Sequence, residues 1–125
     1  MVKLDLGIIK QNDMDAVGIV EVLNTKFESM DCKKGVHFIL HKEIECNSFS
    51  KAYKEYKWTL WYINNGEKFK VTTLSNTSRI VTEKEESEMT KYMEESLLTF
   101  IFNLLLDHNN LTLMLNGRYK GVDTD

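Results

Sequence analysis

The segment Met93–Leu106, MEESLLTFIFNLLL, constrains the fold more than any other part of the chain, because it is apolar on almost every side of a helix. Ser96, Thr99 and Asn103 recur at steps of three and four residues and form one narrow polar line. A helix that is apolar around its circumference lies at the centre of a core or packs against a second chain. In a chain of 125 residues, we expect this helix to be the central core helix or the interface of a homodimer. The residues that we assign to this core or dimer face are Leu98, Ile101, Phe102 and Leu105.

Length and composition predict a single globular domain over residues 1–125, with disorder confined to the last few residues. Hydrophobic residues make up 42% and charged residues 28% of the sequence, which is typical of a soluble domain. The net charge of −3 argues against broad, salt-driven nucleic-acid binding, because such binding needs many contacts between basic side chains and phosphates.

The cysteine content and the N-terminal segment predict a cytoplasmic protein. Cys32 and Cys46 are too few for a disulfide framework and are spaced wrongly for a zinc site. Residues 1–13 lack the basic and apolar regions of a signal peptide. The longest apolar run, Leu97–Leu106, is about half of the roughly 20 residues that a membrane span needs, so we expect no transmembrane helix.

The pair Asn65–Gly66 is the clearest turn signal, because it lies between two segments of alternating polar and apolar residues. A two-residue turn at this pair predicts an antiparallel hairpin in which Trp61 faces Lys70 and Leu60 faces Val71. The register places one set of side chains on the core face, namely Trp58, Leu60, Tyr62, Phe69 and Val71. The opposite face carries Lys57, Trp61, Lys68 and Lys70.

Other alternating segments predict additional strands. Val2–Ile9 places four apolar residues on one face, and Val36–Cys46 alternates apolar with polar side chains. A loop is expected at residues 75–78, followed by a short strand at Arg79–Val81. Residues 111–115 fit either a last strand or a short helix.

Residues 14–30 are open between a helix and a strand. The apolar residues of Val17–Met30 follow helical spacing, and Asp13 is a candidate N-cap. The β-branched run Val17–Val22, which contains Gly18, suits a strand equally well. We favour the helix.

A capping box formed by Thr82 and Glu85 predicts the start of the long helix, which is expected to end near Asp107. Together these elements predict an α+β fold. We expect an antiparallel sheet of four or five strands with this long helix of the C-terminal half packed on one face.

His37, His41, Glu43 and Glu45 gather metal-binding side chains in one segment, but their spacing argues against a shared metal. On a strand, His37 and His41 lie about 13 Å apart at roughly 3.3 Å per residue. Two ligands of one metal lie much closer together. We therefore interpret these residues as the solvated face of a strand and predict no metal and no other cofactor.

The chain contains no recognisable catalytic motif. Cys32 lies beside Lys33 and Lys34, which can lower the pKa of a thiol, but this arrangement is common in loops. Cys46 falls on the apolar face of its strand and is expected in the core. No Gly-rich phosphate loop, nucleophile elbow or zinc-protease motif is present. We predict no catalytic residues and no enzyme activity.

Residues 51–62 interleave lysines with aromatic residues, a composition that is typical of base-stacking platforms. The hairpin register, however, leaves Trp61 as the one clear outward aromatic residue, opposite Lys70. A single outward tryptophan on an acidic protein falls short of the usual nucleic-acid-binding footprint. We instead assign an interaction face to Lys57, Trp61, Lys68 and Lys70.

These observations rank three classes of function. The first is a small, cytoplasmic, non-enzymatic interaction or regulatory module, of the inhibitor or immunity type by analogy, that binds a protein partner or itself as a homodimer. The second is a domain that binds a small ligand or nucleotide in a pocket between the sheet and the long helix. The third is a single-stranded nucleic-acid binder that uses the lysine–tryptophan face of the hairpin.

Overall fold

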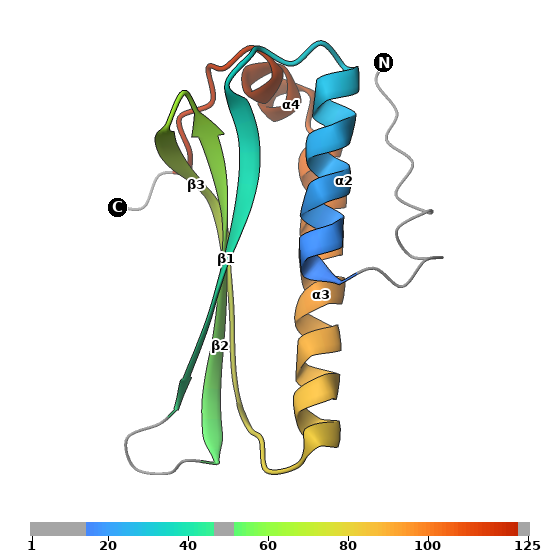
Figure 1. The fold of residues 1–125 in the computed structure, drawn as a ribbon, viewed down its shortest axis with the longest axis vertical. Helices are drawn as coiled ribbons and strands as arrows, with labels where there is room; N and C mark the ends of the chain where they lie inside the picture. The colour runs from blue at the N-terminus through green and yellow to red at the C-terminus, as the bar shows by residue number, and fades with distance from the viewer. Residues whose placement is uncertain (1–14, 47–51, 123–125) are drawn as a thin grey trace.

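The computed structural model describes residues 15–46 and 52–122. Its elements follow the order α2 (Ala16–Ser29), β1 (Val36–Cys46), β2 (Tyr53–Asn64), β3 (Glu67–Arg79), α3 (Glu83–Leu106) and α4 (His108–Leu115). The three strands form one antiparallel sheet in the order β1-β2-β3. Helices α2 and α3 lie side by side over one face of the sheet, and α4 lies at one end of the two layers (Figure 1). The α+β class and the long helix on one face of an antiparallel sheet are therefore confirmed.

The predicted number of strands is wrong: the described residues form three strands, not four or five. Residues 75–78, expected as a loop, belong to β3, and Arg79, expected in a separate strand, is its last residue. Their residue types favour a loop, but each of these residues pairs with a residue of β2, from Ser75 opposite Lys57 to Arg79 opposite Tyr53. Pairing satisfies their backbone hydrogen-bonding groups, so two predicted elements merge into one long strand.

The remaining predicted strands have different outcomes. Residues 111–115 belong to α4, so the helical alternative is confirmed there. The predicted strand Val2–Ile9 and the C-terminal residues 123–125 lie outside the described residues.

The hairpin forms at the predicted turn, since Asn65 and Gly66 both have the positive φ that a type I′ turn requires. The pairing of Trp61 with Lys70 is also confirmed. Beyond this pair the predicted register is wrong, because a β-bulge makes Leu60 face Thr72 in place of Val71. The extra residue brings Leu74 of β3 onto the core face of the sheet, opposite Trp58. That face buries Tyr56, Trp58, Leu60, Tyr62 and Val71.

The segment that was open between helix and strand is the helix α2. Asp15, not Asp13, is its N-cap, and the Asp15 side chain accepts a hydrogen bond of 2.8 Å from the Gly18 amide. The Asn24 side chain ties the helix to β1 by accepting a 2.7 Å hydrogen bond from the Phe38 amide and donating one of 3.0 Å to the Phe38 carbonyl. The buried residues of α2 follow helical spacing and are Ala16, Ile19, Val20, Leu23 and Phe27.

Helix α3 begins at the predicted capping box. The Thr82 hydroxyl accepts from the Glu85 amide at 3.2 Å, and the Glu85 carboxylate accepts from the Thr82 amide at the same distance. The helix then runs for 24 residues, and no described helix is long and apolar enough to cross a membrane. The buried residues of α3 are Met89, Met93, Leu97, Leu98, Ile101, Leu104 and Leu105.

Candidate interaction surfaces

The residues of α3 that the sequence assigned to a core or dimer face fall into a buried group and an exposed group. Leu98, Ile101 and Leu105 are at most 9% exposed and belong to the core of the single chain. Phe102 is 47% exposed, and Leu106, one turn further along, is 64% exposed. The helix is therefore central to the fold and also presents two large apolar side chains to solvent. We call Phe102 and Leu106 the outer apolar face of α3.

The outer face of the sheet carries the predicted lysine–tryptophan set, but the structure groups only part of it. Lys68 lies over the Trp61 ring, with its Nζ 5.8 Å from the ring centroid. Lys70 faces Trp61 directly across the ladder. Lys57 lies four residues from Trp61 along β2 and faces Glu43 of β1, so it does not belong to the same cluster.

The histidine and glutamate side chains of β1 lie on its exposed surface. His41 Nε2 lies 2.9 Å from the Glu43 carboxylate, closer than the rise along the strand suggested, because both side chains point to the same face and lean together. Within residues 15–46 and 52–122, no group of three or more acidic, histidine or cysteine side chains is arranged to hold a metal ion.

The two cysteines differ from the sequence-based expectations. Burial, followed by the nearby Glu28 carboxylate, raises the pKa of the Cys32 thiol, although the adjacent lysines suggested a lower one. Cys46, expected in the core, is exposed at the end of β1. Helix α2 does not cover the core face of β1 at this end, because the helix begins opposite the middle of the strand (Figure 1).

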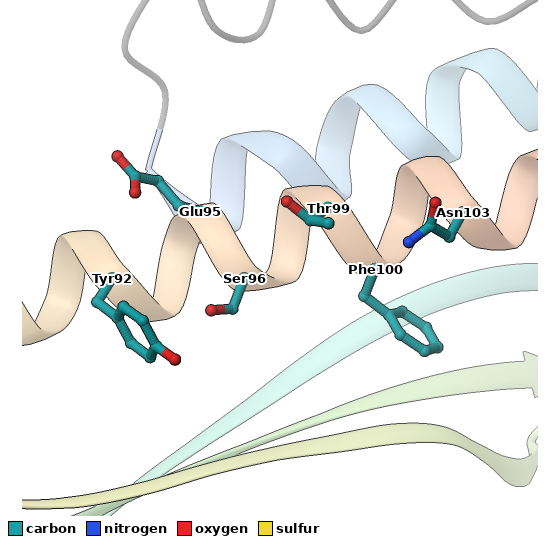
Figure 2. A pocket seen from close by; sticks show the side chains of 6 residues that line it. All are labelled: Tyr92, Glu95, Ser96, Thr99, Phe100 and Asn103. Carbon is teal, nitrogen blue, oxygen red and sulfur yellow. The ribbon is translucent and has the colours of Figure 1, made fainter.

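Two cavities lie along α3, one of them between α3 and β3, where the sequence analysis suggested a pocket between the sheet and the long helix. One cavity of about 420 Å³ lies where β3, α3, the start of α4 and the C-terminal segment meet. A second, of about 360 Å³, follows α3 and shares Phe100 and Asn103 with the first (Figure 2). The polar line of Ser96, Thr99 and Asn103 was the available signal, because all three residues line the groove. We call these two joined cavities the α3–β3 groove.

Comparison of the chain with protein-family models, with curated proteins and with solved structures gave no match.

Proposed function

We propose that this chain is a small, non-enzymatic protein-interaction module that forms a homodimer through the outer apolar face of α3. The observation that carries the proposal is the exposure of Phe102 and Leu106 in a part of α3 whose neighbouring residues Ile101, Leu104 and Leu105 are buried. Large exposed apolar side chains that lie close together are typical of interaction sites. We place the module in the cytoplasm, because Cys32 and Cys46 are both free thiols.

A two-fold arrangement suits this face. In a dimer with two-fold symmetry the same patch meets itself, so Phe102 and Leu106 of one chain would pack against those of the other. Val22 of α2, which is partly buried against the core, offers a further apolar side chain on the helical layer. Helix α2 lies beside α3 in that layer, so both helices can contribute to the contact (Figure 1).

The test is the mass of the protein in solution, measured by light scattering at micromolar concentration. We expect the wild-type chain to have twice its monomer mass of 14.6 kDa. Phe102→Asp should give a folded monomer, because Phe102 is 47% exposed and the new charge meets water. Leu113→Asp is the matched control, since Leu113 is 40% exposed on α4, and this variant should remain dimeric.

A second pair of outcomes separates folding from association. Leu105→Asp should unfold the chain, because burying an unpaired charge in the core costs several kcal/mol. A wild-type protein that remains monomeric throughout the concentration range would contradict the homodimer. The proposal would also fail if Phe102→Asp remained dimeric.

The α3–β3 groove favours a second candidate function, ligand binding between the sheet and the long helix. Its walls combine apolar side chains, such as Phe100 and Tyr119, with polar ones, such as Asn103 and Asn110. This mixture is typical of binding sites, in which apolar surface supplies affinity and a few polar groups supply orientation.

A further inference from the structure

The free edge of β3 differs from the free edge of β1 in charge. Among the described residues, the order β1-β2-β3 leaves one side of each outer strand without a neighbouring strand. β1 is protected in the usual way, since its second half contains His41, Lys42, Glu43 and Glu45. β3 has no charged residue between Lys70 and Arg79 and reads VTTLSNTS. A long, uncharged edge strand is a template for pairing with another extended chain.

The chain itself already places the backbone of Gly121 and Val122 against one end of this edge. The Val122 amide donates a 2.9 Å hydrogen bond to the Lys70 carbonyl. The neighbouring Gly121 approaches Lys70 so closely that an added Cβ would lie 3.1 Å from the same carbonyl oxygen. Val122 also lines the α3–β3 groove. The edge of β3 therefore accepts a main-chain hydrogen bond at Lys70, and the uncharged part of the edge follows Lys70 toward Arg79.

The α3–β3 groove lies beside this edge. Tyr92, Ser96 and Phe100 project from α3 toward the strands (Figure 2). Thr72 and Thr73 line the groove from β3. Successive side chains of an extended strand point to opposite faces, so a strand added to β3 would direct every second side chain into the groove. Main-chain pairing would then supply affinity, and the groove would select the side chains.

The charge of the groove indicates which side chains fit. Asp107 lines the cavity that β3 and α3 share, and none of the residues lining either cavity is basic. Glu95 lines the second cavity, but its side chain projects away from the strands (Figure 2). Phe100, Leu104 and Tyr119 provide the apolar part of the wall. A second copy of the chain, docked edge to edge, would bring two acidic grooves together. A strand with apolar and basic side chains complements the site better.

We propose that the edge of β3 and the α3–β3 groove bind an extended segment of a partner protein by strand addition, and that this segment carries both apolar and basic residues at every second position, the positions that face the groove. The inference shares with the proposed function the class of a protein-interaction module, but it uses a surface different from the outer apolar face of α3. Dimerisation and strand binding can therefore fail independently of one another.

The test uses a fluorescent synthetic peptide in which every second residue, the one that faces the groove, is valine or lysine in turn and the residues between them are threonine. It is added to the full chain and followed by fluorescence anisotropy. We expect saturable binding. A peptide with glutamate in place of lysine should bind about tenfold more weakly or worse, because it meets the acidic wall. A peptide N-methylated on alternate residues should not bind, because it cannot complete the main-chain ladder.

Variants of the protein locate the site. Ser96→Trp places a large side chain in the groove and should weaken binding about tenfold or more. Lys91→Trp is the matched control, since Lys91 is an exposed residue of α3 that does not line either cavity, and it should bind as the wild type does. Phe102→Asp should also bind normally, which separates this surface from the dimer face.

Three results would overturn the inference. They are absence of binding to the lysine-containing peptide, equal binding of the N-methylated peptide, and unchanged binding by Ser96→Trp.

Discussion

At the scale of single residues, the Tyr62 hydroxyl is the polar group most firmly built into the core. Tyr62 is fully buried, and its hydroxyl donates a 2.9 Å hydrogen bond to the Met114 carbonyl of α4. Burial, with a smaller contribution from Cys32, raises the pKa of Tyr62 from 10.0 to about 12. The Tyr62 side chain thereby joins β2 to α4, and it can donate this hydrogen bond only while its hydroxyl is protonated.

This pKa shift predicts a loss of stability in alkaline solution. The unfolded chain releases the phenolic proton near pH 10, whereas the folded chain retains it to about pH 12. The contribution of Tyr62 is therefore complete below pH 10 and is lost as the pH rises to about 12. Two pH units correspond to about 3 kcal/mol in the free energy of unfolding.

Tyr62→Phe is the corresponding test, measured by urea unfolding at neutral and at alkaline pH. At neutral pH the variant should lose about 1–2 kcal/mol, because the buried Met114 carbonyl loses its donor. Its stability should then fall less steeply than that of the wild type above pH 10. Burial also raises the pKa values of Tyr56 and Tyr119, so part of the alkaline loss should remain. Parallel pH profiles of the two proteins would refute this account.

At the scale of secondary-structure elements, the start of α3 combines a capping box with favourable charge. Thr82 and Glu85 exchange hydrogen bonds, and Glu83, Glu85 and Glu86 lie in the first turn, where carboxylates complement the helix dipole. The last turn of α3 contains no basic residue that would complement the helix dipole at that end. Asp107 instead caps the start of α4 by accepting from the Asn109 and Asn110 amides at 3.1 and 3.3 Å.

Thr82→Ala should therefore reduce the free energy of unfolding by about 1 kcal/mol, because two hydrogen bonds of the box are lost while the exposed site undergoes no repacking. Chemical denaturation at neutral pH measures the change. Ser87→Ala, an exposed substitution inside the same helix, is the control and should leave stability nearly unchanged. Equal effects of the two substitutions would show that the box does not stabilise the helix.

At the scale of the whole molecule, charge is distributed unevenly between the sheet and α3. Lys68 and Lys70 flank Trp61 on the outer face of the sheet, whereas glutamates gather at the start of α3. The protein has a net charge of −3, so the lysine–tryptophan cluster lies in an acidic overall field. From this balance we expect a structural role for Trp61 and no binding of nucleic acid.

Trp61→Ala tests that interpretation. We expect the variant to lose about 1 kcal/mol of stability, because the contact with Lys68 and the cross-strand packing of the hairpin disappear. Filter binding to single-stranded DNA and RNA across a salt series should show no specific retention of either protein. Lys57→Ala, outside the cluster, is the control. The nucleic-acid alternative would instead be supported if Trp61→Ala abolished retention and left the melting temperature unchanged.

The features that depend on residues close together in the chain could be predicted from the sequence. The Thr82–Glu85 box, the turn at Asn65–Gly66 and the helical period of Leu97–Leu106 all involve contacts within a few residues. Their hydrogen bonds and backbone angles depend on local residue types, so the pattern is sufficient to predict them. The same holds for the first pairs of the hairpin, since a two-residue turn sets their register.

The features that depend on residues far apart in the chain could not be predicted from the sequence and follow from the three-dimensional fold. Residues 75–78 are strand because β2 pairs with them, although their own composition favours a loop. Leu105 is buried and Phe102 exposed because neighbouring elements cover one flank of α3, while both residues look equally apolar in the sequence. The α3–β3 groove exists because the edge strand and the long helix meet there, and no local pattern specifies the space between two elements that pack together.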